Sequence, residues 1–189
     1  MKTIHTYLLI FILSLSFTSC ISDDDSLPTI VNQEEVITTV SLTLTSENGG
    51  SPIVLRSFDA DGDGLNAPII TVTDDLVANT SYTGSILFLN ETETPSENIT
   101  EEVIEEAEEH QIMYTIGSSL EASISYVDFD VNANPLGTSI TLRTVNTSQG
   151  NITVTLRHLP KKPNDGTLLD AGGETDVQVT FPVTIAADR

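Results

Sequence analysis

Short stretches in which apolar and polar residues alternate constrain the fold of this chain most strongly. Residues 40–44 alternate Val and Leu with Ser and Thr, and the same period of two recurs in residues 152–156 and 177–185. Successive side chains of a β-strand point to opposite faces, so this period predicts strands with one buried and one exposed face. The chain is therefore expected to form β-sheets that are each covered on one side.

Further apolar and β-branched stretches bring the expected number of strands to about nine. They are Ile53–Phe58, Ile69–Thr73, Tyr82–Asn90, His110–Ile116, Ala122–Phe129 and Ser139–Val145. Turn residues rich in Gly, Asn, Pro and Ser separate them. Short strands at this spacing predict an all-β fold, an antiparallel two-sheet β-sandwich of immunoglobulin-like type, over residues 36–189.

One short acidic helix is expected to interrupt the strands. Residues 101–109 contain six glutamates, and they follow Pro95 and Ser96. The apolar residues of this region fall on one stripe at helical spacing, which is typical of a helix packed on a core. They are Ile99, Val103, Ile104 and Ala107. Thr100 or Ser96 is the expected N-terminal cap.

The N-terminus has the layout of an export signal. Residues 1–19 carry Lys2, an apolar stretch and small residues before Cys20, which is the single cysteine of the chain. The run Leu15–Cys20 resembles a bacterial lipobox, which predicts a lipoprotein signal peptide over residues 1–19 and lipidation of Cys20. Residues 20–35 are acidic and aperiodic and predict a flexible tether. The alternative is a free cysteine behind an ordinary signal peptide.

Composition argues against several classes of function. The net charge of −21 repels nucleic acid and attracts cations. A phosphate-binding glycine loop and a G-x-S-x-G nucleophile motif are both missing from the sequence. We therefore expect a protein that is not an enzyme.

One acidic loop is a candidate calcium site. Asp59, Asp61 and Asp63 alternate with small residues and are followed by Gly64, as in the first half of an EF-hand loop, and Asn66 is a further donor. Ile70 occupies the place of the bidentate glutamate, so a true EF-hand is excluded. The remaining alternatives are a calcium loop of another type and an Asp/Gly turn that binds no ion.

Two histidines form a second candidate site. His110 begins one expected strand and His158 ends another. Each is an even number of residues from the apolar residues of its strand, so each should lie on the apolar face. If consecutive strands run up and down, both histidines reach one acidic pole together with Asp128, Asp130 and Asp176. Two imidazoles and a carboxylate such as Glu109 or Glu106 would suit zinc or copper. The alternative is two histidines at the rim that never meet.

The segment behind Cys20 resembles the surface-export signal of Bacteroidetes-type lipoproteins, in which serine and acidic residues follow the lipidated cysteine. Ser22-Asp23-Asp24-Asp25 carries this likeness. The rest of the chain looks like a group of small lipoproteins from the same bacteria, some labelled as having a type 1 periplasmic binding fold. The β pattern disagrees with that label, because such folds alternate strands with helices.

The resemblance implies a cellular location and a partner protein. It implies lipid anchoring to the outer membrane, exposure at the cell surface, and a role as accessory to a TonB-dependent transporter. With the acidic pole, it leads us to expect a non-enzymatic lipoprotein that binds a cation or ligand. The alternative is a structural or adhesive surface module stiffened by calcium.

Overall fold

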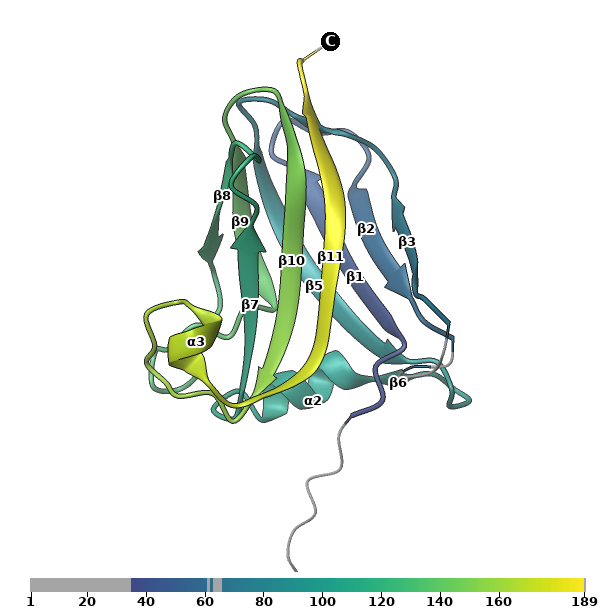
Figure 1. Cartoon of the computed structure of the whole chain (residues 1–189), viewed down its shortest axis with the longest axis vertical. Coiled ribbons are helices and arrows are strands. Elements are labelled where there is room, and N and C mark those ends of the chain that lie inside the picture. The colour runs from purple at the N-terminus through teal and green to yellow at the C-terminus, as the bar shows by residue number, and fades with distance from the viewer. Residues whose placement is uncertain (1–34, 61, 63–65, 189) are drawn as a thin grey trace, which may run out of the picture. The chain divides into compact units, whose positions relative to one another are not determined.

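Two β-sheets pack face to face and enclose the apolar side chains between them (Figure 1). The computed structural model describes residues 35–60, 62 and 66–188, which fall in a compact unit from Glu34 to Arg189. The expected all-β sandwich with a little helix is confirmed.

The larger sheet has seven strands in the order β3-β2-β1-β5-β9-β8, with β6 paired to β5. Their bounds are β1 Thr39–Ser46, β2 Ile53–Phe58, β3 Ile69–Val72, β5 Ser81–Asn90, β6 Glu97–Asn98, β8 Ala122–Tyr126 and β9 Ser139–Thr144. The smaller sheet has the order β4-β11-β10-β7. Its strands are β4 Leu76–Val77, β7 His110–Ile116, β10 Ser148–His158 and β11 Glu174–Ala186.

The core lies between the sheets, as the period of two requires. Burying one apolar face of each sheet removes these side chains from water, which is the main force that stabilises the sandwich. The largest fully buried side chains are Tyr82, Phe88, Phe181, Leu42, Leu44, Leu55, Leu76, Ile112, Ile140, Leu142, Ile152 and Leu156. Hydroxyl residues of the same strands face outward, for example Thr45 and Thr180.

Short elements complete the fold. The two-residue strands β4 and β6 were not expected from the sequence, and β4 pairs with β11 in parallel. The acidic helix α2 spans Ile99–Glu105 and a second helix, α3, spans Leu168–Ala171.

Helix α2 is shorter than predicted and begins differently. Asn98 occupies the N-cap position, whereas the Thr100 hydroxyl is buried and accepts a hydrogen bond from the Phe88 amide at 2.7 Å. The expected stripe holds for Val103, but Ile104 is half exposed. The helix ends at Glu105 because the next residues turn into β7.

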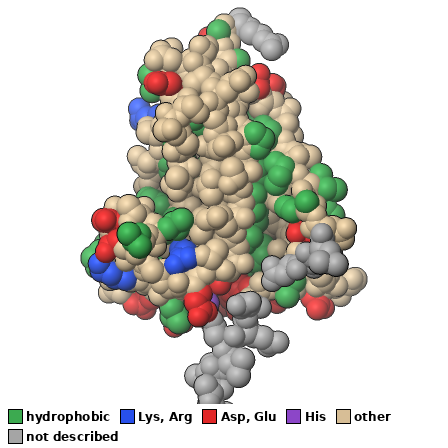
Figure 2. Space-filling view, viewed as in Figure 1, with side chains coloured by type: hydrophobic (Ala, Val, Ile, Leu, Met, Phe, Trp, Pro, Cys, Tyr) green, Lys and Arg blue, Asp and Glu red, His purple; other side chains and the backbone are tan. Residues whose placement is uncertain are grey.

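Six strands share one end of the sandwich, which we call the acidic pole. Strands β1, β7 and β11 begin there, and β2, β5 and β10 end there, because each neighbouring pair among them is antiparallel. Helix α2 runs across this end (Figure 1). Figure 2 shows carboxylate side chains gathered along it. Alternation of strand direction therefore brings distant acidic residues together.

A glycine lets the two neighbours of β5 approach closely in the core. Gly84 pairs with Leu44 of β1 and with Ile140 of β9. A Cβ atom at Gly84 would lie 2.6 Å from Ile140 Cγ1 and 3.1 Å from Leu44 Cδ2. These distances are too short for van der Waals contact, so no side chain fits here without displacement of the core.

We expect Gly84→Val to destabilise the domain by about 1–3 kcal/mol, because it overpacks the core. The matched control is Ser85→Val, which adds the same side chain at the next position on the exposed face and should change stability by about 0.5 kcal/mol or less. Urea unfolding followed by circular dichroism measures both. Equal midpoints for the two variants would contradict the packing described.

Candidate metal centre

Strand pairing places the two histidines side by side at the acidic pole. The β7–β10 register runs without a shift from Ile116 opposite Ile152 to His110 opposite His158. The two imidazole rings have centroids 4.7 Å apart and planes at 46°. His110 is fully buried and the His158 side chain is 11% exposed. Both rings therefore point inward, as their parity with buried apolar residues predicts.

A β-bulge brings a carboxylate to the same place. Along the β10–β11 pair, Leu156 faces Val177 but Arg157 faces Thr175, so Asp176 is an additional residue in β11. Regular alternation with Val177 and Val179 would turn Asp176 outward, whereas the bulge allows it to turn in. Its side chain is only 4% exposed, and its Oδ1 lies 3.9 Å from His158 Nδ1.

His110, His158 and Asp176 together form a group that could hold a metal ion. Each offers one ligand atom, and these atoms all lie within 4.8 Å of one another. Ligands around one zinc ion, with bonds of about 2.0–2.2 Å, stand about 3.4 Å apart. The three side chains would need to close by about 1 Å to bind one ion together.

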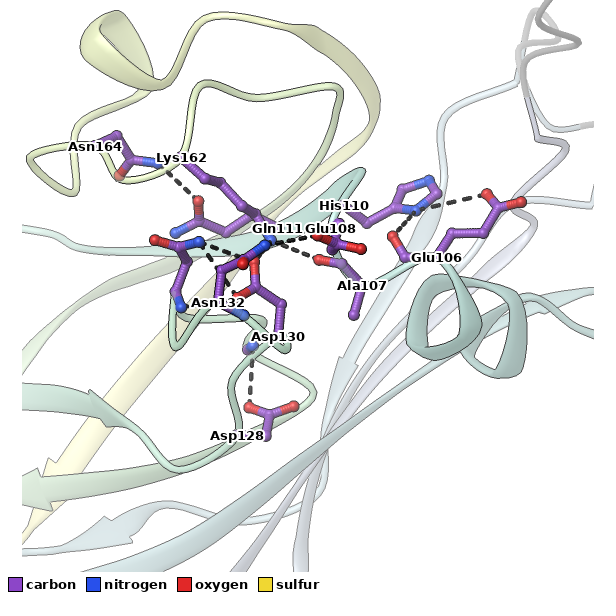
Figure 3. A network of polar contacts seen from close by, with 12 residues as sticks. Glu106, Ala107, Glu108, His110, Gln111, Asp128, Asp130, Asn132, Lys162 and Asn164 are labelled. Carbon is purple, nitrogen blue, oxygen red and sulfur yellow. Dashed lines mark hydrogen bonds and ion pairs between the residues drawn. The ribbon is translucent and has the colours of Figure 1, made fainter.

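The carbonyl of Glu106 sets the tautomer of His110. It accepts hydrogen bonds from the Glu109 and His110 amides, and it lies 3.3 Å from His110 Nδ1. A carbonyl only accepts, so Nδ1 carries the proton and the Nε2 lone pair is available. Metal-bound histidines are commonly held in this way. Figure 3 shows His110 and Glu106 facing each other across this turn.

His110 Nε2 is buried and has no hydrogen-bond partner among the described residues. Burial, the largest influence, lowers the pKa of His110 below its ordinary value, and the neighbouring His158 acts in the same direction. The neutral ring that results is the form that binds metal.

Glu35 faces this nitrogen from the start of the described chain. Its Oε1 lies 3.6 Å from His110 Nε2, and its side chain is 12% exposed. Burial, the largest influence, and the neighbouring carboxylates of Glu102, Asp176, Glu106 and Glu97 together raise the pKa of Glu35 to about 7. This carboxylate therefore holds a proton more tightly than an ordinary glutamate.

A second polar network lies beside the histidines and has a different character (Figure 3). Lys162 and Asp130 form an ion pair at 3.4 Å with both side chains almost fully buried, and Lys162 Nζ also donates to the Ala107 carbonyl at 2.6 Å. Asp130 accepts from the amides of Asn132 and Asn134 at 2.9 Å. The two charges of this network are therefore paired and hydrogen-bonded, as buried charges need to be.

Two pKa values in this network follow from the same contacts. Burial acts to raise the pKa of Asp130, but hydrogen bonds from Asn134 and Asn132 and the charge of Lys162 outweigh it, so this pKa lies below its ordinary value. Burial lowers the pKa of Lys162, against the attraction of Asp130. The contact with Ala107 ties the turn before His110 to the loop that carries Lys162.

The structure brings the two predicted histidines together, but not with a predicted carboxylate ligand. Glu106 Oε2 lies 3.9 Å from His110 Nδ1 and is not part of the group. Glu109, the other expected carboxylate, is exposed and also lies outside the group. It immediately precedes His110 in the chain, and its carbonyl accepts from the Leu159 amide. Asp176 takes its place. The sequence indicates that Asp176 reaches this pole, but carries no signal for the bulge that turns it inward.

Other predicted positions stay apart from this centre. Asp128 does not join it, because its carboxylate accepts from the amides of Gly137, Thr138 and Ser139. Asp59 and Asn66 line a small cavity of about 240 Å³, and Asp59 also lines the larger cavity whose wall includes Glu35 and Asp176. Asp61 and Asp63 of the expected calcium loop lie outside the described residues, as does the predicted lipidation site Cys20.

Comparison with protein-family models, curated proteins and solved structures found no match for this chain. Within the described residues, neither helix has the length and apolar character needed to cross a membrane.

We expect Glu35→Gln to stabilise the metal-free domain at neutral and alkaline pH. A carboxylate whose pKa is raised on folding contributes stability at low pH that is lost as pH rises from about 4.5 to about 7. Glutamine carries no charge, so the variant does not lose stability in this way. At alkaline pH its free energy of unfolding should exceed that of wild type by about 1–2 kcal/mol, or about 2–6 °C in Tm.

Thermal melts at pH 4 and pH 8 in the presence of a chelator test this expectation. The difference between variant and wild type should be small at pH 4 and full at pH 8. Exposed Glu109→Gln is the matched control and should show no such growth with pH. A variant that melts below wild type at pH 8 would contradict the effect of Glu35 burial.

Proposed function

We propose that this protein is a lipid-anchored surface protein that captures a divalent transition-metal ion, zinc or copper, and is not an enzyme. The observation that carries the proposal is the buried Nε2 of His110, which has no hydrogen-bond partner among the described residues and lies beside His158 and Asp176. Leaving a buried polar atom without a partner costs free energy, and a bound cation would remove that cost. Two imidazole nitrogens with carboxylate oxygen are ligands typical of zinc and copper.

The charge around the group supports a cation rather than an anion. Lysines and arginines of the described chain form their ion pairs elsewhere, as in Arg56–Glu91, Lys161–Asp170 and Lys162–Asp130. The carboxylates of Glu35, Glu102 and Glu106 instead act on this site together. Such a concentration of negative charge raises the local concentration of cations.

The predicted lipid anchor would hold the metal group on the side of the domain that is nearer the membrane. A lipid on Cys20 and a flexible tether to Glu35 would hold the acidic pole roughly 20 Å from the membrane surface. Because Glu35 lies beside His110, the metal group is at the end of the domain that receives the tether. This position supports the role of an accessory to a TonB-dependent transporter, which would receive the captured ion.

A calcium-stiffened structural or adhesive module is the competing proposal. It depends on the loop of Asp59, Asp61, Asp63 and Asn66, of which Asp59 and Asn66 line one small cavity. Calcium prefers six to eight oxygen ligands and disfavours imidazole. The two proposals therefore differ in the ion that the domain selects.

We expect zinc to bind the purified chain and to raise its Tm, whereas His110→Gln and His158→Gln should each abolish the shift. At a free zinc concentration about 100 times the Kd, the stabilisation is about 2.7 kcal/mol, or about 5–10 °C in Tm. Binding should weaken at acidic pH, because the imidazoles must be neutral and the carboxylates ionised to bind a metal ion. Calorimetric titration with zinc, copper and calcium, with melting curves, measures these effects.

Glu109→Gln is the control for this experiment, since its side chain is exposed and outside the group. Far-ultraviolet circular dichroism confirms that each histidine variant is folded before it is titrated. Absence of heat and of a melting shift with both zinc and copper would refute metal capture. A response to calcium alone, retained in both histidine variants, would favour the structural module.

Cys20→Ser should release the protein from the membrane. The lipid is the anchor that the sequence predicts, so the variant should move from the detergent phase to the aqueous phase in a phase-separation assay and should lose fatty-acid labelling. As a control, replacing Asp23, Asp24 and Asp25 together with asparagine should keep the lipid but reduce protease accessibility on intact cells. Detergent partition unchanged in Cys20→Ser would disprove lipid anchoring at this residue.

A further inference from the structure

Glu35 is the carboxylate closest in space to His110 Nε2 among the ion pairs of the described chain. It lies outside the three-residue group, but its Oε1 is 3.6 Å from the buried Nε2 of His110. This distance is longer than a hydrogen bond, and the second oxygen, Oε2, is buried without a hydrogen-bond partner among the described residues. His110 Nε2 and Glu35 Oε2 are therefore both buried without a hydrogen-bond partner among the described residues, on two side chains that lie next to each other.

A cation between these atoms would satisfy both. His110 Nδ1 is committed to the Glu106 carbonyl, so Nε2 offers a lone pair and not a proton. The charged groups that act on Glu35 are the carboxylates Glu102, Asp176, Glu106 and Glu97. A metal ion bridging Glu35 and His110 would convert this repulsion into attraction.

A cavity of about 550 Å³ gives access to the same place. Glu35 and Asp176 are both part of its wall, with Asp59, Thr38 and Gln178 among the other lining residues. Neither histidine ring is part of the described cavity wall. An ion that enters this cavity would meet the carboxylate oxygens of Glu35 and Asp176 in its wall.

We infer that Glu35 is the fourth ligand of the metal centre, which closes it as a tetrahedral site of two imidazoles and two carboxylates selective for zinc. The inference rests on the proposed capture of a metal at His110, His158 and Asp176. A site with four protein ligands leaves no position for a reactive water, which is the arrangement of structural zinc sites rather than catalytic ones. Copper(II) prefers tetragonal geometry and would fit such a closed site less well.

Zinc binding at Glu35 would also restrain the start of the domain. Glu35 precedes β1, whereas His110, His158 and Asp176 belong to the opposite sheet. Zinc would therefore clamp residues 35–38 against the ends of β7, β10 and β11. Filling the site would restrain the segment that joins the sandwich to its predicted tether, so that the loaded and empty domains differ at this junction.

The test compares zinc affinity in the full chain with Glu35→Gln, Glu35→Ala and the control Glu109→Gln, using competition with a chelating dye. Loss of groups that only support a metal ligand typically costs 10–100-fold in affinity, so loss of a ligand should cost at least about 100-fold. Glu109→Gln should bind as wild type does. Zinc should also slow amide hydrogen exchange of residues 36–38 in wild type, but not in Glu35→Ala.

Cobalt(II) provides a spectroscopic readout that a merely structural role of Glu35 would not change. The four-ligand site should give the intense visible bands of tetrahedral cobalt, and Glu35→Ala should weaken them as water enters the shell. If wild type binds zinc and the Glu35 variants bind it equally tightly, the inference is overturned and metal capture stands. If wild type binds neither zinc nor cobalt, the inference is overturned, and metal capture is overturned with it if copper does not bind either.

Discussion

The antiparallel pairing of β7 with β10 is the interaction on which the rest of the site depends. Its register is continuous over seven residue pairs and ends with His110 opposite His158. A shift by one residue would turn one histidine to the outer face of the sheet, where Gln111 now meets Asn164. The core enforces this register, because the same shift would also expose Ile112 or Leu156, both fully buried. Hydrophobic burial thus determines the position of two polar rings that contribute little apolar area themselves.

Two buried polar clusters at the acidic pole differ in charge: one contains a neutral ion pair, and the other has an excess of carboxylates. Lys162 and Asp130 neutralise each other and have additional hydrogen bonds, so this cluster is satisfied as it stands (Figure 3). Glu35 Oε2 and His110 Nε2 have no hydrogen-bond partner within the described part of the chain, and the neighbouring carboxylates add to the negative charge. Buried charge is costly unless paired, so the first cluster supports the fold and the second requires a cation or a proton. The first also holds the turn that positions His110, through Lys162 and Ala107.

The proposed zinc centre would join the two sheets at the place where the chain enters the domain. Binding of one zinc ion would then both capture the metal and restrain the segment that joins the sandwich to its predicted tether. A lipid-anchored domain loaded in this way would present its filled pole toward the membrane, where a transporter partner would lie. An adhesive module has no need of a buried site at that end, which is why the location of the site supports capture over adhesion.

The sequence by itself determined the all-β architecture, the strands and the pole that both histidines reach, because a period of two and strand direction are local properties. It also indicated Cys20 and the tether, which no tertiary contact tests. Only the tertiary structure decided which carboxylates join the histidines. Asp176 turns inward because of a bulge between β10 and β11, and Glu35 arrives because the chain enters the domain beside β7. Glu109, the neighbour in sequence, points to solvent. Metal ligands are selected by distance in space, and that distance is set by packing between strands far apart in the chain.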